Sequence, residues 1–144
     1  MERILLIDTD TKERADFKHA LEDAGFEVVD APNGSEGLRH FHRQMCELVI
    51  TEIFMPEKDG IEVIRELRKE FFGVGIIAMS GLSGGTLQLS HALSSEWALN
   101  VAQLFGANAT LRKPVTREQV VNAATRFFTP VTEHVPFVQA ETRV

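Results

Sequence analysis

Two patterns of hydrophobic residues alternate along this chain: short continuous apolar runs, and apolar residues that recur with helical spacing. Short apolar runs predict five buried strands, at Ile4–Ile7, Phe26–Val29, Glu47–Thr51, Gly75–Met79 and Ala109–Arg112. Between and after these runs, apolar residues recur with helical spacing and predict five amphipathic helices. Parallel strands need crossover connections, which are usually helices. The pattern therefore predicts an α/β fold with an open parallel sheet covered by helices on both faces.

The predicted helices have recognisable ends and apolar stripes. Pairs with capping-box spacing precede three of them: Asp10 with Glu13, Asn33 with Glu36, and Thr116 with Gln119. The second helix is expected to carry Leu38, Phe41 and Met45, and the fourth to carry Trp97, Val101, Leu104 and Phe105 on one face.

We expect one compact domain over residues 1–128. Two segments of the chain do not fit the regular alternation of predicted strands and helices. Residues 81–95 begin with several Gly and Ser and are long for a strand-to-helix connection, so we predict an extended, hinge-like segment with one short helical turn. We expect this segment to reshape a partner surface. Residues 129–144, with Pro130 and Pro136, are interpreted as a C-terminal extension or a linker.

The amino-acid composition of the chain argues against some classes of function. The chain has 144 residues, of which 44% are hydrophobic and 25% charged, as in an ordinary globular domain. Its net charge of −6 disfavours nucleic acid as a partner, since phosphate binding needs clustered Lys and Arg. No apolar run approaches the roughly 20 residues of a membrane span, and the single cysteine, Cys46, fits a reducing compartment. We expect a cytoplasmic protein that does not bind a membrane.

Polar side chains follow four of the predicted strands. In open parallel sheets, functional groups gather beyond the carboxyl ends of the strands. The candidates are Asp8, Thr9 and Asp10 after the first strand, Glu52 after the third, Ser80 after the fourth and Lys113 after the fifth. The sequence therefore predicts a cleft containing acids, a hydroxyl and an amine.

Four stretches of the chain resemble, in order, the strand-end motifs of the response-regulator receiver family. They are Ile4–Asp10, Val49–Gly60, Ala78–Ser80 and Leu111–Pro114, and the resemblance covers residues 2–128. It implies a flavodoxin-like (CheY-like) doubly wound sheet of five strands in three αβα layers.

The resemblance also implies a mechanism. Family members accept a phosphoryl group from a histidine kinase on an aspartate at the end of the third strand, with Mg²⁺ held by acids after the first strand. A hydroxyl and a lysine, here Ser80 and Lys113, contact the phosphoryl oxygens. The face formed by the fourth helix, fifth strand and fifth helix then changes its partner. Thr110 occupies a switch position where many members carry an aromatic residue.

This sequence departs from the family pattern at two places. Glu52 stands at the phospho-acceptor position, and Thr9 stands where a carboxylate ligand of the metal is usual. Asp8 remains as the aligned acid, while Asp10 is interpreted as a helix cap rather than a ligand. A missing ligand weakens a Mg²⁺ site, and the longer Glu52 displaces the nucleophilic oxygen. We expect Glu52 to accept a hydrogen bond from Lys113 or to contact Ser80 instead.

The resulting interpretation is an atypical receiver that acts through protein contact, without enzymatic turnover, cofactor or small-molecule substrate. A histidine kinase or a downstream effector is the expected partner class, and Mg²⁺ is expected to bind weakly at Asp8 or not at all. One alternative is a phosphorylatable, Mg²⁺-dependent receiver that uses Glu52 or other acids. A small flavodoxin-like enzyme or nucleotide binder is a further alternative, although a glycine-rich loop does not follow the first strand.

Overall fold

The computed structural model describes residues 1–80 and 88–129 of the chain. Strands and helices alternate through these residues. Their bounds are β1 Arg3–Ile7, α1 Thr11–Asp23, β2 Glu27–Ala31, α2 Gly34–Arg43, β3 Leu48–Glu52, α3 Gly60–Glu70, β4 Gly75–Ser80, α4 Gln88–Phe105, β5 Ala109–Arg112 and α5 Arg117–Phe128.

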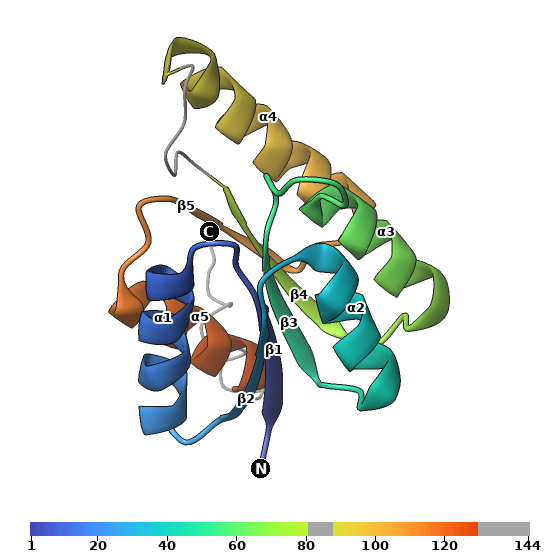
Figure 1. The fold of residues 1–144 in the computed structure, drawn as a ribbon, viewed down its shortest axis with the longest axis vertical. Helices are drawn as coiled ribbons and strands as arrows, with labels where there is room; N and C mark the ends of the chain where they lie inside the picture. The colour runs from blue at the N-terminus through green and yellow to red at the C-terminus, as the bar shows by residue number, and fades with distance from the viewer. Residues whose placement is uncertain (81–87, 130–144) are drawn as a thin grey trace, which may run out of the picture.

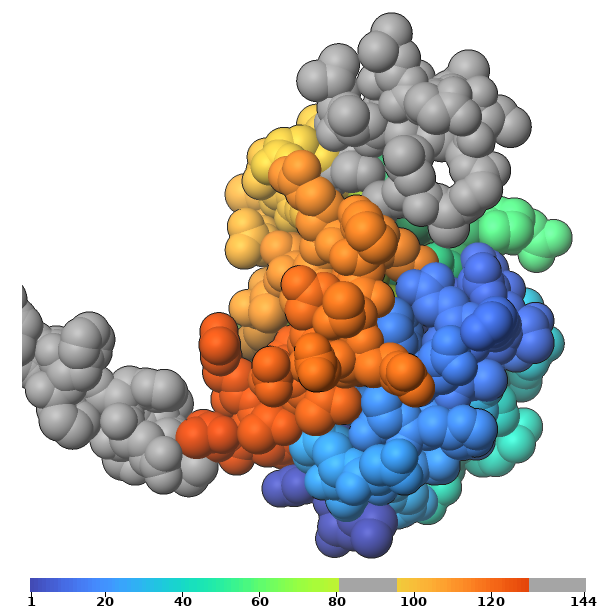
Figure 2. Space-filling view, turned by 90° about the vertical axis from the view of Figure 1, so that its left-hand side faces the viewer, coloured from blue at the N-terminus to red at the C-terminus, as the bar shows by residue number. Residues whose placement is uncertain are grey.

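The strands form one parallel sheet in the order β2-β1-β3-β4-β5, with helices on both of its faces (Figure 1). Helices α1 and α5 cover one face, and α2, α3 and α4 cover the other. Figure 2 views the molecule from the side on which α1 and α5 lie next to each other. The predicted doubly wound fold is confirmed. Its carboxyl edge gathers the ends of β1, β3, β4 and β5.

Alternate residues of each central strand enter two separate cores, because successive side chains of a strand point to opposite faces. In β1, Leu5 and Ile7 pack with α2, α3 and α4, whereas Ile4 and Leu6 pack with α1 and α5. All four side chains are fully buried. The strands are therefore apolar on both faces, as expected for an interior parallel sheet, and polar side chains are left for their ends.

A glycine brings α3 against the end of β3. A Cβ at Gly60 would lie 2.2 Å from the carbonyl oxygen of Glu52 and 2.6 Å from Cα of Ile53, so no larger residue fits without backbone movement. The Gly60 amide also donates to the Ile53 carbonyl over 2.8 Å. Asp59 and Glu62 form a reciprocal capping box that starts α3 at this point. Together these contacts fix the backbone on which Glu52 stands.

The predicted helix caps are present, with one difference. Asn33 and Thr116 accept hydrogen bonds from the third residue of α2 and α5, and Thr116 with Gln119 forms a full capping box. Asp10 accepts from the Glu13 amide over 2.9 Å and so caps α1 as predicted. The Glu13 side chain does not return to Asp10, because it contacts Lys113 instead.

Helix α4 differs most from the sequence prediction. It begins at Gln88, so residues 88–95 are helical rather than part of an extended connection, and residues 81–87 lie outside the described residues. The apolar stripe predicted for it is largely exposed: Trp97 is 62% accessible, Leu104 84% and Phe105 43%. Within residues 96–105, the part of α4 whose side chains are described, the buried residues are Ala98, Leu99 and Ala102. Small residues turned toward the sheet let this helix pack closely, which leaves the bulky residues outside.

Helix α2 is shorter than its apolar pattern suggests. It ends at Arg43, with Leu38 and Phe41 buried as predicted. Met45 lies beyond the helix end and is 57% accessible, so its assignment to the apolar face of α2 was wrong.

Candidate functional site

Four of the predicted site residues lie buried at the carboxyl edge of the sheet. Asp8 is fully buried, and Glu52, Ser80 and Lys113 are at most 8% accessible. The parallel register places Glu52 beside Met79 on β4 and pairs Ser80 with Arg112, the residue before Lys113. Charged groups are rarely buried this deeply unless they are paired. The contacts of these residues therefore decide what the site can do.

Both carboxylate oxygens of Glu52 are engaged. Oε1 accepts from the backbone amide of Thr9 over 2.9 Å and from the Thr9 hydroxyl over 2.8 Å. Oε2 accepts a hydrogen bond from the Lys113 ammonium in an ion pair whose side chains are each 4% exposed. The predicted contact with Lys113 is present. Thr9, whose hydroxyl replaces an expected metal ligand, has become a hydrogen-bond donor to the acid at the end of β3.

Lys113 lies between two carboxylates. Besides Glu52, its ammonium contacts Oε1 of Glu13 at 3.1 Å. Its backbone amide donates to the Ser80 carbonyl over 2.7 Å, which continues the pairing of β4 with β5. Burial lowers the pKa of Lys113, but the adjacent Glu52 carboxylate outweighs it, so the pKa is raised and the ammonium form is held. Lys113 is therefore a fixed internal cation.

Glu13 is the site residue that the sequence analysis missed. Its place in the first turn of α1, three residues after Asp10, suggested a role in capping alone. The signal that could have found it is its position on a helix that starts at the carboxyl edge, where its side chain can reach the end of β5. Glu13 and Lys113 also line a hollow of about 490 Å³ between α1 and the segment joining β5 to α5. The acid cluster, formed by Asp8, Glu13 and Glu52 around Lys113, therefore adjoins a surface opening.

Asp8 is the least neutralised acid of the cluster. Its Oδ1 accepts from the Asp10 amide over 2.9 Å, and its backbone carbonyl accepts from Arg14 over 2.8 Å. Its Oδ2 is buried without a hydrogen-bond partner among the described residues. Burial first, and then the nearby charge of Glu52, raise the pKa of Asp8 to about 7. Near neutral pH this side chain is therefore poised between its charged and neutral forms.

The remaining predicted residues lie around this cluster. Ser80 ends β4 with its Oγ buried and unpartnered among the residues that the structure describes. Thr110 lies on the edge strand β5, where it pairs with Ala78 and is half-buried, without an aromatic ring at that position. Asp10 is exposed and caps α1. The structure thus brings together Asp8, Thr9, Glu52 and Lys113, and adds Glu13.

Three carboxylates of this cluster could face a cation. Asp8, Glu13 and Glu52 each offer an oxygen, and these oxygens lie within 4.8 Å of one another. The unpartnered Oδ2 of Asp8 suits a hard cation such as Mg²⁺, which prefers carboxylate oxygens. The other two acids are already paired with the Lys113 ammonium. The donor set therefore fits a divalent cation only in part, with Asp8 as its one uncommitted ligand.

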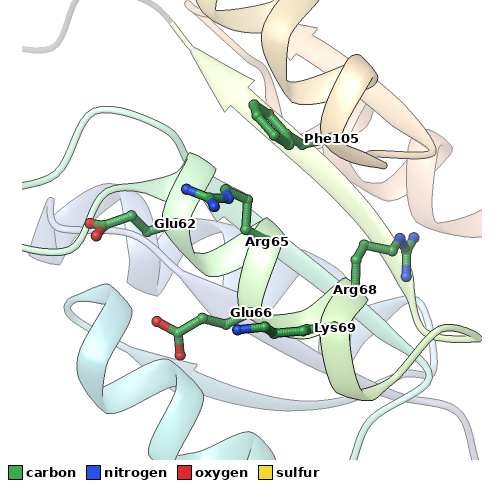
Figure 3. A pocket seen from close by; sticks show the side chains of 6 residues that line it. All are labelled: Glu62, Arg65, Glu66, Arg68, Lys69 and Phe105. Carbon is green, nitrogen blue, oxygen red and sulfur yellow. The ribbon is translucent and has the colours of Figure 1, made fainter.

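A larger hollow elsewhere is lined by different chemistry. It measures about 520 Å³ and lies between α3 and α4, where Glu62, Arg65, Glu66, Arg68 and Lys69 stand opposite Phe105 (Figure 3). The Arg65 guanidinium lies over the Phe105 ring, 5.5 Å from its centre. Arg68 donates to the carbonyls of Phe72, Val74 and Gly106, so it ties α3 to the neighbouring loops. The lining carries charges of both signs, and both arginines are engaged in contacts that hold α3 against its neighbours. We therefore regard this hollow as a surface feature rather than a reactive centre.

A family model described as "Response regulator receiver domain" matches residues 4–125. The chain belongs to the response regulator receiver domain family. Receiver domains are regulatory modules of two-component signalling, which supports the fold class and the signalling role implied by the strand-end motifs.

Curated relatives are similar over part of their length. The chain is 32% identical over 120 residues to the "CAI-1 autoinducer sensor kinase/phosphatase CqsS" of Vibrio cholerae, covering 83% of this chain and 16% of that protein. It is 40% identical over 65 residues to the "Response regulator receiver protein CpdR" of Brucella abortus, covering 45% and 54%. The chain thus spans only a small part of CqsS and about half of CpdR.

Solved structures share the fold. A response regulator receiver domain from Clostridium thermocellum superposes with a TM-score of 0.67 at 28% identity, covering 89% of this chain and all of that one. The chemotaxis response regulator CheY4 of Vibrio cholerae superposes with a TM-score of 0.74 at 23% identity, covering 88% and 98%. Among the described residues, no helix has the length and hydropathy needed to cross a membrane.

Proposed function

We propose that this chain is an atypical receiver whose acid cluster is held in one arrangement by an internal ion pair rather than switched by phosphorylation of an aspartate. The observation that carries the proposal is the engagement of both oxygens of Glu52, by Thr9 on one side and by Lys113 on the other. This network takes up the acceptor side chain and the lysine that the family uses for the phosphoryl group.

Phosphoryl transfer needs an accessible acceptor oxygen in line with the donor phosphorus. The Glu52 side chain is only 4% exposed. Its Oε2 is paired with Lys113, and its Oε1 accepts two hydrogen bonds from Thr9. Attack by either oxygen would break a charge-assisted or backbone hydrogen bond in a buried site. The extra methylene of glutamate also moves the carboxylate away from the place that an aspartate would give it. Both effects oppose transfer.

Weak binding of Mg²⁺ would also oppose phosphoryl transfer. If bound, Mg²⁺ would neutralise charge on a phosphoryl group, and Asp8 and Glu13 would be the side chains to hold it. A proton competes with the cation for Asp8 near neutral pH, because burial and the charge of Glu52 raise the pKa of Asp8 to about 7. Glu13 is shared with Lys113. We therefore expect weak Mg²⁺ binding at most.

Output is proposed to be contact with a protein partner through α4. Trp97, Leu104 and Phe105 present exposed apolar surface along this helix, and such surface on a soluble domain commonly marks a protein interface. The acidic net charge disfavours nucleic acid in this role. A sensor kinase or a downstream effector is the partner class that the family membership supports.

The experiment is phosphorylation by a small phosphodonor with excess Mg²⁺, followed by intact-mass measurement. We expect no adduct on the wild-type chain. The matched variant Thr9→Asp with Glu52→Asp should bind Mg²⁺ and gain one acid-labile phosphoryl group, because it restores the missing ligand and the shorter acceptor. A stoichiometric adduct on Glu52 of the wild type would refute the proposal. Unreactive wild type and variant together would point to a further obstacle, with the Glu13–Lys113 contact as the next residue pair to remove.

One observation favours a second candidate, a phosphorylatable receiver that uses Glu52 despite its length. The Oδ2 of Asp8 is buried and unpartnered, as a ligand awaiting a cation would be. Mg²⁺ titration by calorimetry separates the two candidates, since a phosphorylatable site needs Mg²⁺ binding that Asp8→Asn abolishes. Absence of binding in the wild type supports the first candidate.

A further inference from the structure

An apolar groove lies at the opposite edge of the sheet from the acid cluster. It measures about 500 Å³ and is lined by Phe41, Met45, Cys46, Glu47, Phe71, Gly73, Val74, Phe127 and Phe128. These residues come from the end of α2, the segment before β3, the segment between α3 and β4, and the last turn of α5. Only Glu47 among them is charged. Aromatic side chains on two sides make this a preformed apolar site.

The walls of the groove are held in place by close packing. Phe127 sits over Gly75, where a Cβ would lie 2.2 Å from its ring, and its own ring centre is 5.0 Å from that of Phe128. On the other side, the ring centres of Phe41 and Phe71 are 4.8 Å apart in an edge-to-face arrangement. A preformed pocket between fixed aromatic walls binds an apolar side chain with little ordering cost.

The chain itself supplies a segment of matching chemistry. Helix α5 ends at Phe128, a lining residue, and Thr129 closes it with a hydrogen bond from its hydroxyl to the Thr125 carbonyl. The sequence then continues to Val135-Pro-Phe-Val138, the most apolar stretch after α5. An extended chain spans about 3.3–3.6 Å per residue, so the seven residues from Phe128 to Val135 reach about 25 Å. That reach is enough to bring the segment back to the groove, because Phe128 itself lines it.

We propose that this groove binds residues 135–138 of the same chain, with Phe137 as the anchor between the aromatic walls. A proline at position 136 disfavours a helical conformation for the residue before it, which suits a peptide that binds along a groove. Because the segment and the groove belong to one chain, the effective concentration of the segment at the groove can reach the millimolar range. The rival occupant is a second copy of the chain, for which Phe72, 86% exposed between two lining residues, is the natural insert. The proposal is independent of the acid cluster.

Cys46 provides a reporter, because it is the only cysteine and lines the groove. Burial raises the pKa of its thiol to about 11, so its reaction with a thiol reagent is slow and sensitive to added cover. We expect the variant Phe137→Ser with Val138→Ser to react about fivefold faster than wild type, which corresponds to a docked population of about four fifths. The matched control, Ala140→Ser with Val144→Ser, should react at the wild-type rate. Urea unfolding of each protein shows that stability is unchanged.

A disulfide test identifies the occupant. In the variant Phe137→Cys, mild oxidation with diamide should link Cys46 to the new thiol within one chain, at a rate independent of protein concentration. Gly73→Lys should slow this link, since a side chain there enters open space at the groove. Covalent dimers whose yield rises with concentration would overturn the proposal in favour of a second copy. Equal thiol reactivity of wild type, variant and control would overturn it by showing that the tail does not cover Cys46.

Discussion

Replacing Asp8 by Asn should remove a large part of the pH dependence of stability. The pKa of Asp8 rises from an ordinary 3.8 to about 7 in the folded chain, first because of burial and then because of Glu52. Between these two values the folded state holds a proton that the unfolded state releases. Stability from this group is therefore fully present below about pH 4 and is lost as the pH rises through 7.

The size of the effect follows from that gap. At 1.36 kcal/mol per pKa unit, the interval from 3.8 to about 7 corresponds to about 4 kcal/mol as an upper limit. Asn keeps the acceptor that binds the Asp10 amide and has nearly the same shape. The new amide group adds a cost that does not vary with pH. The difference between Asp8→Asn and wild type should therefore shift in favour of the variant by several kcal/mol from pH 4 to pH 8.

The assay is urea unfolding of both proteins at unit intervals from pH 4 to pH 8. Ser80→Ala is the control, because it removes a second buried oxygen that has no partner among the described residues, without removing a charge. It should displace the stability curve without changing its slope. Glu52→Gln removes the second cause of the raised pKa, so it should move the loss of stability to lower pH. Parallel curves for Asp8→Asn and wild type would refute the assignment of this proton to Asp8.

The remaining predictions concern packing and the internal cation. Lys113→Met should cost about 3–5 kcal/mol in urea unfolding at pH 7, since it leaves buried carboxylates without their cation; a cost under 1 kcal/mol would contradict the ion pair. Gly60→Ala should lower stability by at least about 1–3 kcal/mol through collision with the end of β3, whereas Gly73→Ala, in open space, should be neutral or slightly stabilising. In α4, Leu99→Ala should cost about 2–4 kcal/mol and exposed Leu104→Ser less than about 0.5. Equal losses at both positions would show that the helix is rotated.

The fold and the location of the site could be predicted because both follow from topology. Alternating strand and helix patterns leave few arrangements, and a parallel sheet brings strand ends to one edge wherever the helices lie. Asp8, Glu52 and Lys113 needed only this rule to be placed together. The local chemistry of Asp10 also followed, since an N-cap depends on its own first turn.

The sequence did not reveal how α4 is rotated about its axis or how far the Glu13 side chain reaches. The pattern of α4 contains two apolar faces, and large size favoured Trp97 and Leu104, yet Ala98 and Ala102 face the sheet because they allow close approach. Glu13 could cap its helix or cross to β5, and only the distance to Lys113 decides between these. Periodicity carries no information about such tertiary choices.

The binding of beryllofluoride with Mg²⁺, followed by ¹⁹F NMR, tests the central claim most directly. Beryllofluoride adds to an acceptor carboxylate as a phosphoryl mimic, so it needs a free oxygen at position 52 and a usable cation site. We predict no bound signal for the wild-type chain and a saturable bound signal for Thr9→Asp with Glu52→Asp. A saturable bound signal for the wild type, lost in Glu52→Gln, would contradict the account.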